Sequence, residues 1–545
     1  MTSGDASRRL IAQGRAVLGI ELGSTRIKAC LIGDHPADVL AVGEHTWESS
    51  QVEGHWTYSL DEVWHGVQSA YADLAGAVRA HHDVQLTEVR AMGVSAMMHG
   101  YLALDADDQL LVPMRTWRNT STGRAAGALT ELFGQNIPLR WSIAHLHQAV
   151  LDREPHVPQV AFLTTLAGYV HWQLTGRKVL GVGDASGMFP VDTGTTDYDE
   201  ELLRHYDELV AGEGLRQGLR DLLPEVLPAG ATAGVLTARG AALLDPTGTL
   251  QAGAVLAPPE GDAGTGMVAT NAVAPGTGNV SAGTSIFAMV VLGQPLRGIH
   301  HEIDLVTTPA GHPVAMVHCN NGASELASWA GLFGRFAEAA GTPMSPDDVF
   351  EVLLREALEG EADGGGLAAY NYLAGEPITG LEAGVPLFLR TPGSSFTLAN
   401  TFRAQLYAVF GTLALGLRIL SEEGVGVERM FAHGGLFRTA GVAQRFLAAA
   451  LDAPVVLSRT ASEGGAWGMA VLAAYLQHAE TVDLTSYLQD LVFADAPVEV
   501  TQPHPEDVTG FAAYLDTYRA GLAAERAAVQ ALSPQPSRTT TKDGP

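Results

Sequence analysis

The sequence contains only two cysteines, Cys30 and Cys319, among its 545 residues. Two thiols cannot form a disulfide framework, so this scarcity favours a protein of the reducing cytosol over a secreted one. The sequence also lacks a run of about 18 apolar residues, the length that a membrane-spanning helix needs. The first 20 residues carry three arginines but not the apolar stretch of about 7–15 residues that marks a signal peptide. We therefore expect a cytoplasmic protein.

Basic residues are few. Lys and Arg number 32 against 60 Asp and Glu, which gives a formal net charge of −28 at pH 7. Such an acidic surface repels phosphate backbones and anionic lipids, so we expect neither a nucleic-acid partner nor a membrane partner. A small anion such as a nucleotide needs only a local site and is not excluded. Hydrophobic residues make up 46% of the chain, which is enough to form large cores in two to four domains of about 100–200 residues.

Strand-like and helix-like patterns alternate along the chain, which is typical of an α/β architecture. Residues 89–98 are predicted to form a buried strand, and residues 60–78 have helical spacing. Residues 1–16 are polar and are expected to be a frayed leader, and residues 533–545 are expected to be a disordered tail.

Two similar turns open the two halves of the chain. Gly23-Ser24-Thr25 separates two apolar runs and predicts a β-hairpin, and Gly283-Thr284-Ser285 repeats the arrangement. Backbone N–H groups of such turns converge on phosphate oxygens, and the hydroxyls add donors. Arg26 and Lys28 supply positive charge near the first turn. Gly-Thr turns are common, so one turn is weak evidence, whereas a matching pair favours two similar domains that clamp a triphosphate.

Asp262 lies between glycines, at the point where a strand-like run passes into a run of small residues. A carboxylate there can accept a proton from a hydroxyl nucleophile, although an aspartate with a pKa near 4 is a poor base unless it is well positioned. The alternative is a structural role, in which Asp262 caps the helix that follows.

A diglycine, Gly434-Gly435, stands between a strand-like run and a helix-like pattern over residues 442–451. It would let a flat group lie against the backbone, beside a helix N-terminus that favours anions. A plain strand-to-helix turn explains the pattern equally well. Residues 463–470 are predicted to open another helix, whose small residues indicate tight packing against a neighbour.

Taken together, these motifs resemble those of the FGGY carbohydrate kinases, over residues 17–476. The phosphate hairpins of that family resemble residues 19–28 and 278–285, its catalytic loop resembles residues 261–264, and its adenosine-binding segment resembles residues 434–438. All four occur in the order that the family shows. The resemblance implies an α/β fold with two actin-like (ribonuclease H-like) ATPase domains that flank a central cleft.

The resemblance also implies a division of the chain. An N-terminal sugar-binding and catalytic domain would span residues 17–273 and a C-terminal nucleotide-binding domain residues 274–480. A helical extension would follow over residues 481–532. The family further implies a possible homodimer.

By the same resemblance, Asp262 is the catalytic general base and ATP is the phosphoryl donor. The residues implied in binding ATP are Gly23, Ser24, Thr25, Lys28, Gly283, Thr284, Gly434 and Gly435. Glu21 and Asp262 are implied in holding Mg²⁺.

The segment Ser95-Ala96-Met97-Met98-His99-Gly100 resembles the Ser/Gly-Gln-Met-His-Gly motif of the xylulokinase branch. The implied substrate-binding residues are Met98, His99, Gly100, Trp117 and Asp262. A histidine considered alone is more often a satisfied core or turn residue. An indole such as that of Trp117 suits the C–H face of a sugar. Two further segments, residues 168–176 and 184–187, resemble a scaffold of the family, in which a helix ends at Gly176 and Asp184 and Ser186 hold the connection that follows.

Three positions depart from the pattern of the family. Glu21 and Asn119 stand where an aspartate is usual, and Leu436-Phe437 replaces the residues that usually follow the diglycine. The longer side chain of Glu21 moves its carboxylate by about one methylene, which Mg²⁺ tolerates when water mediates the contact. Asn119 indicates a substrate site unlike that of an ordinary xylulokinase.

We therefore predict a sugar kinase that transfers a phosphoryl group from ATP to a terminal hydroxyl of D-xylulose or L-ribulose, giving the 5-phosphate and ADP. Two alternatives remain open. One is a kinase for another sugar or polyol, such as glycerol, erythritol or ribitol. The other is a regulatory ATPase on the same fold without a sugar substrate.

Overall fold

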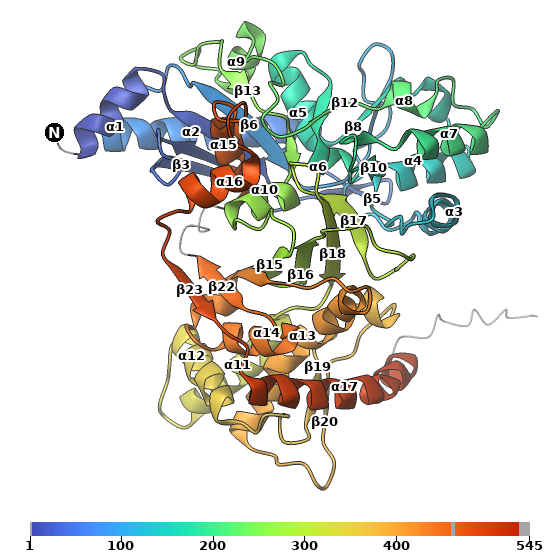
Figure 1. The fold of residues 1–545 in the computed structure, drawn as a ribbon, viewed down its shortest axis with the longest axis vertical. Coiled ribbons are helices and arrows are strands. Elements are labelled where there is room, and N and C mark those ends of the chain that lie inside the picture. The colour runs from blue at the N-terminus through green and yellow to red at the C-terminus, as the bar shows by residue number, and fades with distance from the viewer. Residues whose placement is uncertain (1–2, 459–463, 533–545) are drawn as a thin grey trace, which may run out of the picture. The chain divides into compact units, whose positions relative to one another are not determined.

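The computed structural model describes residues 3–458 and 464–532 (Figure 1). The chain divides into two compact units. The first comprises Met1–Gly278, Val290–Met316 and Ser458–Pro497, and the second comprises Asn279–Met289, Val317–Leu457 and Val498–Pro545. The contiguous division expected from the sequence is therefore wrong for residues 290–316 and 458–497, which return to the first unit. The tail expected to be disordered, residues 533–545, lies outside the described residues.

The first unit contains a sheet with the strand order β13-β6-β1-β2-β3, and β14 pairs with β6. β1 and β2 form the hairpin predicted around Gly23, and β6 is the strand predicted within residues 89–98. β2 pairs antiparallel with both β1 and β3, whereas β6 runs parallel to β1. The strands are β1 (Val17–Leu22), β2 (Arg26–Ile32), β3 (Val39–Thr46), β6 (Ala91–Ala96), β13 (Val255–Leu256) and β14 (Glu260–Gly261).

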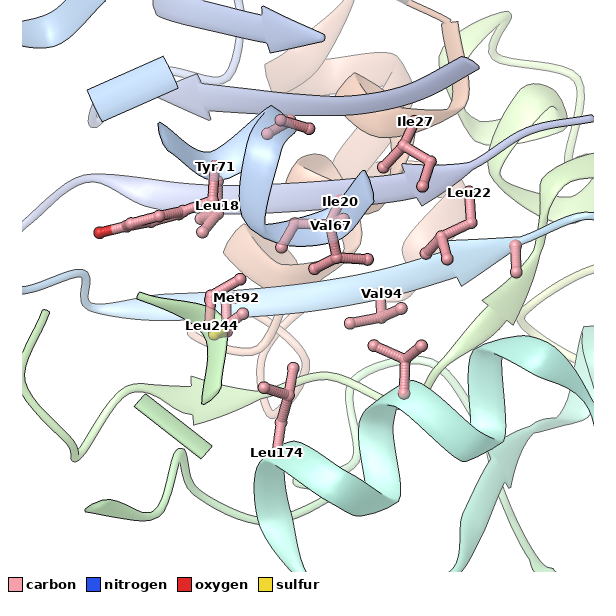
Figure 2. Packing of buried hydrophobic residues seen from close by; sticks show 14 of the residues in the cluster. Leu18, Ile20, Leu22, Ile27, Val67, Tyr71, Met92, Val94, Leu174 and Leu244 are labelled. Carbon is pink, nitrogen blue, oxygen red and sulfur yellow. The ribbon is translucent and has the colours of Figure 1, made fainter. Parts of the chain in front are cut away.

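Alternation along β1 gives its two faces different tasks. Leu18, Ile20 and Leu22 join the hydrophobic core with residues of β6 and of the helix α2 (Leu60–His82), as Figure 2 shows. Gly19 faces the helix α15 (Gly464–Tyr475), and a Cβ at this position would collide with the α15 backbone at Ala466. Glu21 shares this second face with Gly19. The predicted helix over residues 60–78 and the predicted tight packing of α15 are both confirmed.

Residues 3–12 form the helix α1 (Ser3–Ala12), so the expectation of a frayed leader is wrong. Ile11 is fully buried in the core of the first unit. Arg8 forms an ion pair of 3.2 Å with Asp83, just after the end of α2. These tertiary contacts hold a segment whose polar composition alone gave no sign of order.

The other elements of residues 50–269 surround this sheet in chain order. They are β4 (Ser50–Val52), β5 (His55–Thr57), β7 (Leu102–Leu104), α3 (Gly123–Phe133), α4 (Ser142–Leu151), β8 (Phe162–Thr164), α5 (Leu166–Thr175), β9 (Val179–Gly181), α6 (Val182–Ala185), β10 (Val191–Asp192), β11 (Asp197–Tyr198), α7 (Glu200–Leu209), α8 (Leu219–Leu222), β12 (Glu225–Leu227), α9 (Ala238–Leu244) and α10 (Asp262–Ala269).

A second sheet has seven strands in the order β17-β18-β16-β15-β21-β22-β23. They are β15 (Thr277–Ala282), β16 (Ile286–Val291), β17 (Asp304–Thr307), β18 (Pro313–Cys319), β21 (Arg429–His433), β22 (Val455–Ser458) and β23 (Val498–Thr501). β15 and β16 are neighbours, so the second hairpin prediction is confirmed. The expected helical extension over residues 481–532 contains a strand, β23, as well as the helices α16 (Leu484–Tyr487) and α17 (Pro505–Leu532).

The helices of the second unit include α11 (Ser324–Ala339), α12 (Pro346–Glu356), α13 (Leu398–Glu422) and α14 (Ala443–Leu451), with a short hairpin of β19 (Ala368–Tyr370) and β20 (Leu387–Leu389). By length and composition α13 could cross a membrane, but 78% of its most apolar window is buried within the protein. Arg403 of this helix forms a buried ion pair with Asp507 of α17. These contacts are those of a core helix.

Candidate active site

Asp262 and Met98 meet where two paired strands end. β14 pairs with β6 at Gly261 and Ala96, so the residues that follow the two strands lie side by side. The backbone N–H of Met98 donates a hydrogen bond of 3.0 Å to Oδ1 of Asp262. Gly261 is the N-cap residue of α10, and Asp262 is the first residue of this helix. Asp262 therefore does not hold the N-cap position that the structural alternative required.

The carboxyl groups of Asp262 and Glu21 share a poorly solvated environment. Burial raises the pKa of Asp262 to about 6, and the hydrogen bond from Met98 acts in the opposite direction. Burial and the negative charge of Asp262 raise the pKa of Glu21 to about 7. Lys28 lies opposite Glu21 in the hairpin and lowers the pKa of Glu21. A cation placed between these two carboxylates would relieve their repulsion.

The longer side chain of Glu21 reaches the first turn of α15. The N–H of Ala466 donates a hydrogen bond of 3.2 Å to Oε2 of Glu21, and a Cβ at Gly465 would collide with Oε1. Two neighbouring carboxylates suit Mg²⁺, which proteins often bind through one or two carboxylates together with water and substrate phosphates. Among the described residues no group of three or more acidic, His or Cys side chains could hold a metal, so this pair fits only that water-rich and phosphate-rich mode.

The first hairpin turn has its carbonyl groups bound and its donors available. Trp47 donates from Nε1 to the carbonyl of Gly23 at 2.7 Å and from its backbone N–H to that of Thr25 at 3.1 Å. The hydroxyl of Tyr58 donates to the carbonyl of Ser24 at 2.6 Å. In the part of the chain that the structure describes, the N–H groups of Ser24 and Thr25 have no acceptor. Such a turn presents donors to an anion.

The second hairpin turn is held in the same way. The N–H groups of Gly322 and Ala323 donate to the carbonyls of Thr284 and Gly283, both at 2.8 Å. Gly283 closes the turn with a bond of 2.9 Å to the carbonyl of Ser285. Within the described residues the N–H of Thr284 has no acceptor. Both turns thus combine bound carbonyls with available donors, which the sequence motif alone did not show.

The diglycine lies next to the second hairpin turn. Gly434 has a φ of 113°, and a Cβ there would collide with the carbonyl of Ala282, directly before Gly283. The helix predicted to follow is displaced: a 3₁₀ turn, Gly435–Arg438, comes first, and α14 begins only at Ala443. Leu436 and Phe437 are buried. The departure from the pattern of the family at these two positions therefore serves packing.

The predicted sugar-binding residues lie in the first unit with Asp262. Nδ1 of His99 lies 3.1 Å from the carbonyl oxygen of Gly187, and its ring stacks on Trp141 with 6.2 Å between centroids. His99 has a φ of 68°, and Gly100 follows with a φ of 110°. Trp117 donates from Nε1 to Oγ of Ser24 at 3.1 Å. The indole that was predicted to face a sugar thus contacts the first hairpin turn.

Asn119 has a structural function that an aspartate could not perform. Its Oδ1 accepts from the N–H of Trp56 at 2.8 Å, and its Nδ2 donates to the carbonyls of Trp56 at 2.9 Å and Thr116 at 3.0 Å. An ionised carboxylate only accepts hydrogen bonds. The substitution therefore ties β5 to the segment that carries Trp117.

The scaffold predicted around Asp184 and Ser186 is confirmed. α5 ends at Gly176, which has a φ of 80°. Thr165 donates from Oγ1 to Oδ2 of Asp184 at 2.6 Å, and Ser186 donates to the carbonyl of Gly183 at 2.6 Å. Burial raises the pKa of Asp184 to about 7.

The sequence analysis missed Glu260, two residues before Asp262. Its side chain is 1% exposed, and its Oε2 accepts the backbone N–H of Asp184 at 3.0 Å. Burial and the charge of Asp184 raise the pKa of Glu260 well above its usual range. A charged residue directly before a Gly-Asp pair was the only available signal, and nothing local distinguished it from a solvated residue.

Comparison with known proteins places this geometry. Over 200 residues the chain is 26% identical to the xylulose kinase of Escherichia coli, which covers 35% of this chain and 40% of that protein. It is 22% identical over 433 residues to the xylulose kinase of Haemophilus influenzae, with 77% of this chain and 82% of that one covered.

The ligand-bound xylulose kinase of Lactobacillus acidophilus superposes with a TM-score of 0.75 at 18% identity, and covers 95% of this chain and 99% of that one. This likeness shows the two-domain sugar kinase fold. Residues 16–249 match the N-terminal domain, and residues 278–476 the C-terminal domain, of the FGGY family of carbohydrate kinases. The matched residues make up more than half of the chain, which therefore belongs to the FGGY family of carbohydrate kinases.

Proposed function

We propose that this protein is an ATP-dependent kinase that phosphorylates a terminal hydroxyl of a ketopentose, D-xylulose or L-ribulose, to its 5-phosphate. The observation that carries the proposal is the pair of Asp262 and Met98: a carboxyl group with a pKa of about 6, bound to the backbone next to His99. The Met98-His99-Gly100 segment and the relatives named xylulose kinase favour D-xylulose.

In the proposed reaction the Asp262 carboxylate accepts the proton of the sugar hydroxyl as the hydroxyl oxygen attacks the γ-phosphorus of ATP. The bond from phosphorus to the bridging oxygen breaks, and ADP leaves. With a pKa of about 6, Asp262 is ionised at pH 7 and yet a stronger base than an exposed aspartate, which suits general-base catalysis. His99 and Trp117 orient the sugar.

The two hairpin turns bind the phosphates of ATP in this proposal. Gly23, Ser24, Thr25 and Lys28 contribute from the first unit, and Gly283 and Thr284 from the second. The backbone next to Gly434 and Gly435 receives the adenosine. Mg²⁺, held by Glu21 and Asp262, would neutralise the phosphate charge when bound.

A substrate screen tests the proposal. ADP release is measured in a coupled assay with Mg²⁺-ATP and D-xylulose, L-ribulose, glycerol, erythritol or ribitol. We expect the highest kcat/KM with a ketopentose. A polyol as the best substrate would overturn the proposed acceptor but leave the kinase assignment intact. ATP hydrolysis that no sugar or polyol stimulates would favour the regulatory ATPase.

Asp262→Ala tests the base. We expect a loss of about 100- to 10,000-fold in kcat, with ATP binding retained because the carboxyl acts on the hydroxyl and not on adenine. The thermal transition of the variant serves as the folding control. Near-normal turnover in a folded variant would exclude Asp262 as the base.

A further inference from the structure

The segment 181–187 contacts the site at two points. At its C-terminal end, the carbonyl oxygen of Gly187 lies 3.1 Å from Nδ1 of His99. In its middle, the N–H of Asp184 donates a hydrogen bond of 3.0 Å to Oε2 of Glu260. The segment thus contacts both the predicted sugar ligand and the residue that stands two positions before the predicted base.

Two contacts between β6 and β14 close a ring. Glu260 pairs with Ser95 and Gly261 with Ala96 in the parallel ladder of the two strands. Beyond the ladder, the N–H of Met98 donates to Oδ1 of Asp262. The path from His99 through segment 181–187, Glu260 and Asp262 therefore returns along Met98 to His99.

Glycines allow the members of the ring to approach so closely. A Cβ at Gly181 or Gly183 would collide with the carboxyl oxygens of Glu260. A Cβ at Gly187 would lie 2.7 Å from Nδ1 of His99, and one at Gly261 would lie 2.8 Å from the Met98 side chain. Real Cβ atoms do not make contacts this short, so the ring depends on side-chain-free positions at both ends of the segment.

We propose that Glu260 is a positioning residue, whose carboxyl group holds segment 181–187 against β14 and so fixes His99 relative to Asp262. This inference rests on the proposed function, because it assigns the sugar to His99 and the proton to Asp262. Glu260 itself touches neither the substrate nor the nucleotide in this arrangement. Its effect passes through the backbone of residues 184–187 to the imidazole of His99.

Three variants separate positioning from simple stability. Glu260→Ala removes the acceptor of the Asp184 N–H. Glu260→Gln keeps an oxygen acceptor at the same reach. Asp245→Ala is the matched control, because Asp245 is also a buried carboxyl of the first unit, and it accepts the N–H groups of Thr247, Thr249 and Leu250.

We expect Glu260→Ala to raise KM for the sugar and lower kcat, with a combined loss of about 100-fold in kcat/KM, since a misplacement of about 1 Å has this effect. KM for ATP should not change. Glu260→Gln should restore most of the activity, and Asp245→Ala should lower the melting temperature without changing either KM. A Glu260→Ala variant with wild-type kinetics, or a Gln variant as impaired as the Ala variant, would overturn the proposal.

Amide hydrogen exchange tests the ring without reference to activity. Glu260→Ala should accelerate exchange in peptides covering residues 95–100 and 181–188 together, whereas Asp245→Ala should accelerate it only around residues 245–250. If Glu260→Ala does not fold, Gly187→Ala opens the ring at its other end and should accelerate exchange in the same two peptides. Exchange that changes in one peptide alone would overturn the ring. A failure of the proposed kinase reaction would leave this result unaffected.

Discussion

The backbone N–H of Met98 donates a hydrogen bond of 3.0 Å to Oδ1 of Asp262, although 164 positions separate the two residues in the sequence. This contact joins the end of the strand that leads to His99 with the start of the helix that carries the proposed base. It also stabilises the charged form of a carboxyl group that burial would otherwise make still harder to ionise.

The pH dependence of sugar phosphorylation should reflect this environment. Burial raises the pKa of Asp262 from 3.8 to about 6, and only the ionised carboxylate accepts a proton. We therefore expect kcat/KM for the sugar to be constant above pH 7 and to fall about tenfold per pH unit well below 6. A profile that stays flat down to pH 4.5 would show that no such group is titrating.

Substitutions at Glu21 separate its metal-binding role from its contact with α15. Glu21→Gln keeps an acceptor for the Ala466 N–H but loses the negative charge, so activity should fall and require more Mg²⁺. Glu21→Asp keeps the charge but is one methylene too short for Ala466. It should therefore retain part of the activity and unfold at a lower temperature.

The measurements are a Mg²⁺ titration of activity and thermal melts with and without Mg²⁺-ATP. If Glu21→Gln behaves like the wild type at every Mg²⁺ concentration, Glu21 has no metal role and serves only α15.

His99→Ala should affect the sugar more than the nucleotide. The change removes the ring that stacks on Trp141 and contacts the carbonyl of Gly187, and it leaves polar groups unpaired at about 1–3 kcal/mol each. We expect KM for the ketopentose to rise about tenfold or more, with KM for ATP unchanged, in steady-state kinetics with each substrate varied. Equal shifts in both constants would identify His99 as a structural residue.

Trp47→Phe should weaken the phosphate-binding turn. It removes the Nε1–H bond to the carbonyl of Gly23 but keeps an aromatic ring that can stack on Tyr58. We expect KM for ATP to rise several-fold while KM for the sugar stays constant, because a carbonyl released into the turn would oppose an anion.

Trp64→Phe is the control for Trp47→Phe, since the Trp64 indole also loses a donor, to the Tyr169 hydroxyl, in the same unit. A larger ATP effect in Trp64→Phe than in Trp47→Phe would contradict the assignment.

The sequence by itself determined the local features of the site. A glycine between two apolar runs permits only a short turn, so both hairpins were predictable, as were the strand β6 and the end of α5 at Gly176. The position of Asp262 after a strand end was also readable. These features depend on neighbouring residues, whose backbone preferences and burial pattern are visible along the chain.

Only the tertiary structure decided which residues support these motifs. Trp47 and Tyr58 bind the first turn, Glu260 reaches segment 181–187, and Glu21 reaches α15 across more than 440 positions. The order of α1 and the return of residues 458–497 to the first unit were equally invisible. Each depends on contacts between distant segments, whose free energy comes from burial and hydrogen bonding in the folded state, and no local pattern encodes which segments will meet.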